Sequence, residues 1–150
     1  MVPKVGVGVF VLNAAGQFIL GKRKGSIGAD TWALAGGNLE FGESFQTCAK
    51  REVFEETGLQ IHNLKFLTAT NHVMADKHYV TVFMVGVVSD PNTQPQSKIM
   101  EPEKCTAWEW ITWDELRAEG EAQMSSSNHK GRVLFEPLIN LFQQRPDLRV

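Results

Sequence analysis

Three glutamates stand close together in one predicted helix, at a spacing that suits cation binding. Glu52, Glu55 and Glu56 occupy positions i, i+3 and i+4, which share one side of an α-helix. Two carboxylates ~6 Å apart repel each other by about 3 kcal/mol at an effective dielectric constant near 20. A hard divalent cation with oxygen ligands is the simplest group that would neutralise them. The spacing therefore predicts a metal site, and a solvated acidic face is the alternative.

The helix that carries these glutamates has recognisable ends. Ser44 is a plausible N-cap and Gly58 a C′ residue, so residues 45–57 are predicted to be helical. Lys50 and Thr57 are expected to lie away from the glutamates. The apolar residues fall on the same side as the glutamates: Phe45, Cys48, Ala49 and Val53. An ordinary amphipathic helix places its charges opposite its apolar stripe, so this arrangement indicates function.

The spacing over residues 37–59 resembles the Nudix box without a gap. The match consists of Gly37, Glu43, Arg51-Glu52-Val53, Glu55-Glu56 and Gly58-Leu59 at the intervals of that signature. The resemblance implies a Mg²⁺-dependent hydrolase, with Mn²⁺ able to substitute. Such an enzyme cleaves a diphosphate that is linked to another group, usually a nucleoside.

The resemblance also implies roles for the residues of the box. Glu52 and Glu56 would bind the metal, and Glu55 would either bind it or orient an attacking water. Arg51 would pair with acidic residues and hold the helix against the preceding loop through Glu43. Glu43 stands just before the helix, where the helix dipole favours an anion. It would therefore cap the helix, reach the metal, or do both.

Two glycines precede the box and follow a short predicted strand. Gly36 and Gly37 allow a backbone carbonyl to approach metal or phosphate closely. In Nudix enzymes a carbonyl of this pair often ligates the metal, so Gly37 is expected to be a ligand and both glycines to contact substrate. Ala35 replaces the usual proline, which supplies no ligand. We therefore expect a softer loop with intact chemistry.

Several segments outside the box resemble the small MutT-like nucleoside-triphosphate diphosphatases of nucleotide-pool sanitation. They are residues 21–26, 78–81, 101–104, 108–110 and 134–135. This likeness implies hydrolysis of a nucleoside or deoxynucleoside triphosphate, such as 8-oxo-dGTP or dCTP, to the monophosphate and pyrophosphate. The alternatives are another substrate, such as ADP-ribose, NADH, a dinucleoside polyphosphate or capped RNA, and a non-catalytic nucleotide-binding module.

Three residues in these segments are further candidates for the site. Arg23 would contact phosphate through its fork of donors, or else belong to an exposed basic turn. Glu103 would act as a base or an extra metal ligand, or else be an exposed charge. Phe135 matches a residue that would stack on the base in the related enzymes. Glu136 follows it where those enzymes have another aromatic residue, so base preference stays open.

The elements that must position these residues alternate between strand and helix patterns. Strands are predicted at 4–12, 17–22, 32–35, 64–70, 79–88 and 106–112, and further helices at 113–118 and 133–143. Residues 89–104 are predicted to form a long loop and 119–130 a mobile connection. No repeat or internal boundary is visible, so residues 1–150 are expected to form a single Nudix domain. Its fold is predicted to be an α/β/α sandwich with a mixed sheet and a central carboxylate-bearing helix.

Composition narrows the class of protein further. The chain has 150 residues, of which 43% are hydrophobic and 21% charged, with a net charge of −2. These values are typical of a soluble globular domain, and the longest apolar run is too short to span a bilayer. We therefore expect a cytoplasmic protein without a membrane partner. The net charge disfavours long nucleic acid as a partner and leaves a small nucleotide. A homodimer is implied only by the resemblance.

Overall fold

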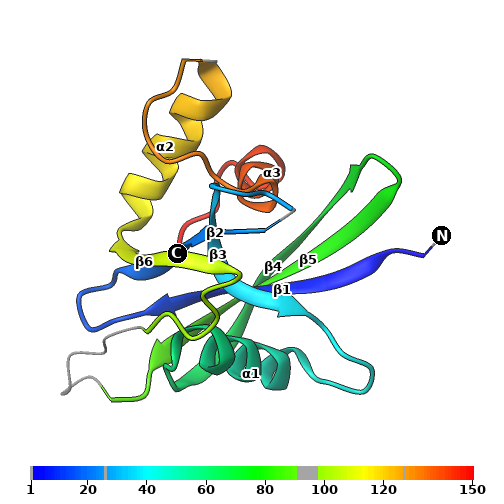
Figure 1. The fold of residues 1–150 in the computed structure, drawn as a ribbon, viewed down its shortest axis with the longest axis vertical. Coiled ribbons are helices and arrows are strands. Elements are labelled where there is room, and N and C mark those ends of the chain that lie inside the picture. Colours follow the sequence, from blue (N-terminus) through cyan, green and yellow to red (C-terminus); the bar gives the residue numbers. More distant parts are fainter. Residues whose placement is uncertain (1, 26, 91–97, 127) are drawn as a thin grey trace.

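A computed structural model describes residues 2–25, 27–90, 98–126 and 128–150 and shows a six-stranded mixed sheet with three helices (Figure 1). The elements are β1 (Lys4–Leu12), β2 (Phe18–Arg23), β3 (Trp32–Asn38), α1 (Phe45–Thr57), β4 (Ile61–Met74), β5 (Lys77–Val88), β6 (Cys105–Ile111), α2 (Trp113–Ser125) and α3 (Glu136–Gln144). The strand order is β4-β5-β1-β3-β2-β6. β1 pairs in parallel with β5 and antiparallel with β3, which makes the sheet mixed.

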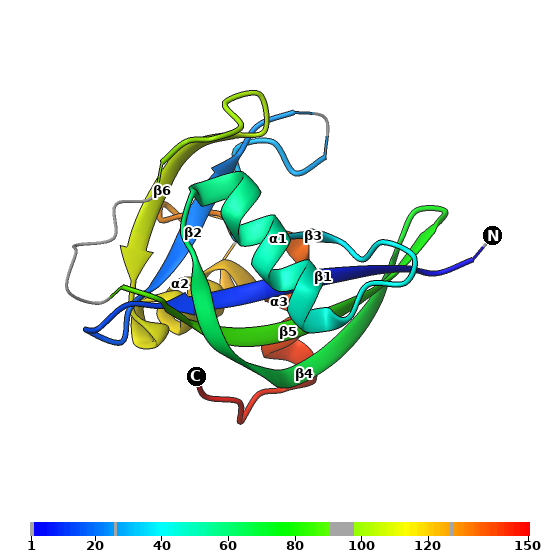
Figure 2. The same cartoon turned by 90° about the horizontal axis from the view of Figure 1, so that it is seen from below.

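Helices cover both faces of the sheet, as Figure 2 shows. Because successive strand side chains point to opposite faces, β1 contributes to two cores. Val7 and Val9 pack in the core under α1, with Val53 of that helix. Phe10 packs in the other core with Leu116 of α2 and Leu138 of α3. The predicted α/β sandwich with a mixed sheet is confirmed.

The α1 helix begins and ends where its caps predict. Ser44 Oγ accepts a hydrogen bond from the Thr47 N–H at 3.1 Å, and Gly58 adopts a left-handed conformation with φ of 74°. The expectation that Thr57 lies away from the core is wrong, because Thr57 is fully buried. Its hydroxyl donates to the Val53 carbonyl at 2.6 Å. The satisfied hydroxyl lets a polar side chain occupy the core.

Other elements are longer than predicted. β3 continues through the glycine pair to Asn38, because Gly36 and Gly37 pair with Gly8 and Val7 of β1. The pair is therefore part of the sheet and does not end the strand.

The predicted mobile connection at 119–130 is wrong for its first half, since α2 continues to Ser125. Gly120 does not end that helix. It is buried, and a Cβ there would lie 2.6 Å from the Phe142 ring. Gly120 lets α2 pack closely against Phe142 of α3. A sequence pattern alone does not distinguish such a packing glycine from one that ends a helix in a turn. The predicted loop at 89–104 falls partly on residues 91–97, which lie outside the described residues.

Cys48 and Cys105 are both buried and have free thiols. Among the described residues, no helix is long and apolar enough to cross a membrane.

Candidate active site

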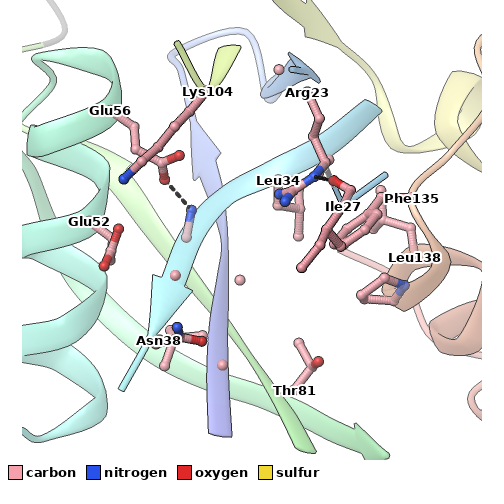
Figure 3. Close-up of a pocket in the computed structure, with 18 of the residues that line it drawn as sticks. Arg23, Ile27, Leu34, Asn38, Glu52, Glu56, Thr81, Lys104, Phe135 and Leu138 are labelled. Atoms are coloured by element: carbon pink, nitrogen blue, oxygen red, sulfur yellow. Dashed lines mark hydrogen bonds between the residues drawn. The ribbon is translucent and has the colours of Figure 1, made fainter. Parts of the chain in front are cut away.

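A cavity of about 530 Å³ lies between α1 and the segment that leads into α3 (Figure 3). Its size is in the range of pockets that hold small ligands, roughly 300–1,000 Å³. Six of the predicted site residues line it: Arg23, Gly36, Gly37, Glu52, Glu56 and Phe135. The structure thus brings together residues from β2, β3, α1 and the start of α3. Glu43, Arg51, Glu55 and Glu103 are not part of this lining.

Glu56 joins α1 to β3 at one wall of this cavity. Its Oε1 accepts a hydrogen bond from the Gly36 N–H at 2.7 Å, drawn as a dashed line in Figure 3. Burial raises the pKa of Glu56 to about 8, and the neighbouring charges of Glu52 and Glu101 act in the same direction. The hydrogen bond from Gly36 opposes this shift without cancelling it. A cation at this point would favour the ionised carboxylate.

Glu52 lies one turn before Glu56 and packs directly against Gly37. A Cβ at position 37 would lie 2.4 Å from the Glu52 carboxyl carbon, a distance that only glycine avoids. Burial raises the pKa of Glu52, while the guanidinium of Arg51 opposes the shift. The close approach predicted at the glycine pair is therefore an approach of β3 to the carboxylates of α1.

Arg51 connects the helix to the loop before it. Nε and Nη2 donate to the two carboxylate oxygens of Glu43 at 2.7 and 2.9 Å. Nη1 donates to Glu52 at 2.8 Å and to Glu55 at 3.4 Å, and Nη2 also reaches the Asn38 carbonyl at 3.2 Å. The paired guanidinium lowers the pKa of Glu43 to about 2. Arg51 thus fixes the position of Glu52 while its own head group stays outside the cavity lining.

The loop before β6 presents a different glutamate from the one that the sequence favoured. Glu103 is exposed, whereas Glu101 and Lys104 line the cavity. A turn explains the difference, because the N–H groups of Lys104 and Cys105 both donate to the Glu101 carbonyl. The Glu101 carboxylate contributes to the raised pKa of Glu52 and Glu56. The Glu-Pro-Glu-Lys motif signals a turn but does not indicate which glutamate faces inward.

Arg23 and Phe135 lie across the cavity from the α1 carboxylates (Figure 3). Arg23 Nε donates to the Ile27 carbonyl at 3.1 Å, and its Cζ lies 4.2 Å from the centroid of the Phe135 ring. Burial lowers the pKa of Arg23, and the Glu56 carboxylate opposes that shift. A single cavity therefore holds a guanidinium on one side and carboxylates on the other.

Two glycines of β1 leave space in the same cavity. A Cβ at Gly6 would meet nothing nearer than the Gly37 carbonyl oxygen at 3.8 Å. A Cβ at Gly8 would make ordinary contacts with Leu34 and Phe83 at 3.5 and 3.6 Å. Both glycines line the cavity, so the sheet offers a flat floor at this point. This space suits a planar ring.

The donor set at α1 fits a hard divalent cation. Within the described ranges, no three His, Cys, Asp or Glu side chains are already arranged around a common metal position. Glu52 and Glu56 nevertheless supply carboxylate oxygens at one cavity wall, close enough to raise the pKa of Glu56 through their like charges. Oxygen ligands select cations such as Mg²⁺. The repulsion between these groups is what a bound cation would relieve.

Comparison with known proteins decides the family. The profile of the NUDIX domain matches residues 2–130, which is most of the chain. The chain belongs to the Nudix family. The resemblance seen in the spacing of residues 37–59 is thereby confirmed.

Individual relatives of this Nudix chain are distant. The RNA pyrophosphohydrolase of Actinobacillus pleuropneumoniae serotype 5b is 26% identical over 124 residues, which cover 71% of this chain and 58% of that protein. The oxidized purine nucleoside triphosphate hydrolase of Danio rerio is 35% identical over 69 residues, 42% of this chain and 44% of that protein. The Nudix chain therefore spans little more than half of the first of these relatives.

The Nudix chain also resembles solved structures. The crystal structure of a MutT NUDIX hydrolase from Burkholderia pseudomallei superposes with a TM-score of 0.67 at 26% identity, covering 76% of this chain and 86% of that one. This likeness agrees with the Nudix fold of the chain.

Proposed function

We propose that this Nudix protein hydrolyses a nucleoside or deoxynucleoside triphosphate to the monophosphate and pyrophosphate, with Mg²⁺ as cofactor. The observation that carries the proposal is the composition of one cavity. It contains the carboxylates of Glu52 and Glu56, the guanidinium of Arg23 and a flat floor at Gly6 and Gly8. A triphosphate needs cationic contacts for its charge, and a base needs a flat apolar slot.

The metal would be held mainly by the carboxylates of α1. Glu52 and Glu56 are the first ligands in this proposal, with the Gly37 carbonyl and Glu55 as further candidates. When bound, Mg²⁺ offsets phosphate charge and lowers the pKa of a coordinated water, and Mn²⁺ is expected to substitute for it. Glu43 acts in this proposal through Arg51, with which it forms a two-point ion pair.

A carboxylate must also accept the proton of the attacking water. Glu101 takes the place of Glu103 as the candidate from the loop, because Glu101 lines the cavity and Glu103 does not. Glu55 is the candidate from the helix, although its side chain is 49% exposed. Arg23 stabilises the charge that develops on the phosphate, which is the usual role of a guanidinium at such a position.

A second candidate function is removal of pyrophosphate from the 5′ end of RNA. It is favoured by the relative named RNA pyrophosphohydrolase. The cavity lining argues against it, because it contains five glutamates and only three Lys or Arg side chains among the described residues. A long polyanion is bound mainly through cationic contacts to its phosphates. We therefore favour a mononucleotide over RNA as the substrate.

A substrate panel separates these possibilities. The protein is incubated with Mg²⁺ and nucleoside triphosphates, 5′-triphosphorylated RNA, ADP-ribose, NADH or dinucleoside polyphosphates. Pyrophosphate is then converted to phosphate with pyrophosphatase and detected by colour. Pyrophosphate from a mononucleotide supports the proposal. Release only from RNA supports the second candidate. AMP from ADP-ribose, which is detected by chromatography because this reaction releases no pyrophosphate, supports another Nudix activity. No turnover on any substrate supports a binding module.

The variant Glu56→Gln tests the metal site directly. It keeps the oxygen that accepts the Gly36 N–H but loses the charge, so the fold is expected to persist. We expect turnover to fall at least about a hundredfold, because both charge compensation and water activation depend on this carboxylate. Near wild-type turnover in a folded, Mg²⁺-saturated Glu56→Gln protein would refute the assignment.

A further inference from the structure

The Phe135 ring, which the resemblance assigned to base stacking, is in contact with the Arg23 side chain. The Arg23 guanidinium lies over the ring with Cζ 4.2 Å from the centroid, and Figure 3 shows the two side chains together. A cation within about 6 Å of a ring centroid is attracted to the ring face. One face of Phe135 is therefore covered by Arg23. This arrangement differs from an aromatic ring that is free on both faces to stack on a base.

We propose that Phe135 is a positioning residue that holds the Arg23 guanidinium in place for a phosphate group of the substrate. The inference deepens the proposed function and rests on it, because it assigns the phosphate contact to Arg23. Two contacts fix the guanidinium, namely the stack on Phe135 and the 3.1 Å hydrogen bond from Nε to the Ile27 carbonyl. A long, flexible side chain held at two points loses less conformational freedom when it binds a ligand.

The donors that remain on Arg23 are the ones that suit a phosphate. Within the described residues, the Arg23 side chain donates a hydrogen bond through Nε, to the Ile27 carbonyl. Both Nη groups are thus left for a ligand, and such a pair of donors matches two oxygens of a phosphate. Arg23 lines the same cavity as Glu52 and Glu56, so its guanidinium and the α1 carboxylates face the same bound ligand.

Hydrogen bonds fix the backbone of the segment that carries the Phe135 ring. The Phe135 N–H donates to the Trp32 carbonyl at 2.9 Å, and the Trp32 N–H donates to the Val133 carbonyl at 2.8 Å. The side-chain amide of Gln123 accepts from the Leu134 N–H at 2.7 Å and donates to the Leu134 carbonyl at 3.4 Å. The segment before α3 therefore pairs with β3 on one side and with a glutamine of α2 on the other.

Gly28 packs closely against the Phe135 ring. Gly28 has φ of +64°, and a Cβ there would lie 2.6 Å from a ring carbon of Phe135. The Thr31 N–H and hydroxyl both donate to the Gly28 carbonyl, which fixes this turn. Bonds from β3 and α2 thus fix the backbone that carries Phe135, and Gly28 packs against the ring.

A ligand without a base distinguishes positioning from stacking. Inorganic tripolyphosphate with Mg²⁺ is used as a competitive inhibitor of nucleotide hydrolysis for wild type, Phe135→Leu, Phe135→Tyr and Arg23→Gln. We expect Phe135→Leu to weaken tripolyphosphate binding about tenfold, the equivalent of ~1.4 kcal/mol. Phe135→Tyr keeps a ring face and should bind close to wild type. The double variant Arg23→Gln/Phe135→Leu should bind no worse than Arg23→Gln alone, because the two residues act as one unit.

Two results would overturn the positioning role. One is a Phe135→Leu protein that binds tripolyphosphate like wild type but loses affinity for the nucleotide, since that pattern belongs to a base-stacking residue. The other is a double variant whose losses add, which indicates independent roles. Wild-type protein that hydrolyses no mononucleotide would instead overturn the proposed function, and the tripolyphosphate affinities can still be measured by calorimetry.

Nuclear magnetic resonance tests the contact without any substitution. In the wild-type protein, the Arg23 Nε–H proton signal should be shifted by the ring current of Phe135 and exchange slowly, because it donates to Ile27. Phe135→Tyr should preserve both properties. An unshifted, rapidly exchanging Arg23 signal in wild type would refute the proposal, even if Phe135→Leu fails to fold.

Discussion

The carboxylates of α1 are ionisable groups that the fold holds in an unfavourable environment. Glu56 is largely buried beside Glu52, and burial together with like charge raises its pKa to about 8. The amide of Gly36 compensates only in part. A protein that needed these residues only for stability would be better served by apolar side chains of similar size. The arrangement therefore supports the proposal that a cation binds there.

At residue scale, the two glutamates of the loop before β6 give a matched pair of variants. Glu101→Gln removes a carboxylate from the cavity lining, and Glu103→Gln removes an exposed one two residues away. We expect turnover to fall about tenfold or more in Glu101→Gln, the scale of a lost proton acceptor or charge contact. Glu103→Gln should stay close to wild type. Equal losses in both, measured as kcat with saturating Mg²⁺, would contradict the placement of Glu101.

The ion pair of Glu43 with Arg51 predicts how the free energy of unfolding changes at low pH. The pKa of Glu43 is lowered to about 2 in the folded protein, from its ordinary value of 4.5. Its contribution to stability is therefore present above about pH 4.5 and is lost as the pH falls towards 2. Glu43→Gln should remove that part of the acid dependence of the free energy of unfolding. Urea titrations across this range check the slope, with the exposed Glu121→Gln as control.

At element scale, the approach of β3 to α1 determines where glycine is required. A Cβ at Gly37 would lie 2.4 Å from the Glu52 carboxyl carbon, whereas a Cβ at Gly6 would meet only an oxygen at 3.8 Å. Gly37→Ala is expected to displace Glu52 and to weaken Mn²⁺ binding at least about tenfold, since one ligand would move. Gly6→Ala should leave Mn²⁺ affinity unchanged. Calorimetry with Mn²⁺ compares the two, and equal affinities would refute the explanation.

Two glutamine side chains form hydrogen bonds with backbone groups at the edges of the sheet. Gln123 pairs with both backbone groups of Leu134. Gln144 does the same for Asn71 of the edge strand β4, at 3.4 Å to its N–H and 2.6 Å to its carbonyl. A side-chain amide has one donor side and one acceptor side, as a peptide group does. The glutamine amide thus takes the place of a neighbouring strand and satisfies backbone groups that no further strand of the described residues pairs with.

At the scale of the whole molecule, binding of Mg²⁺ and proton binding should compete. Glu56 has a folded pKa of about 8 without metal, above its ordinary value of 4.5. The folded metal-free protein therefore binds more protons than the unfolded chain between those values, and its stability falls as pH rises through that window. Mg²⁺ requires the ionised form. The increase in melting temperature caused by Mg²⁺ should thus grow from about pH 5 to about pH 8.

Glu56→Gln provides the control for this pH dependence. The neutral amide cannot titrate, so the metal-free variant should be more stable than wild type near pH 8 and closer to it near pH 5. Differential scanning calorimetry at both pH values measures the effect. A Mg²⁺-induced shift in wild type that is the same at both pH values would contradict the prediction. The homodimer expected from the resemblance stays a prediction at this scale.

Much of the fold and part of the candidate site follow from local sequence patterns. The α1 helix was predictable because Ser44 and Gly58 cap it and because positions three and four residues apart share a side. β1 was predictable from its alternating pattern, and the Nudix box indicated the metal chemistry. In each case the residues that decide the pattern belong to one continuous segment of the chain.

Only the tertiary structure decided which side chains from distant segments meet. The turn at Glu101 directs that residue and not Glu103 into the cavity, and Arg23 stacks on a ring 112 positions further along the chain. Thr57 and Gly120 are buried by helices and loops that a local pattern does not contain. Local spacing determines the face on which a side chain lies. The packing of separate elements determines what that face contacts, and this is where substrate preference will be decided.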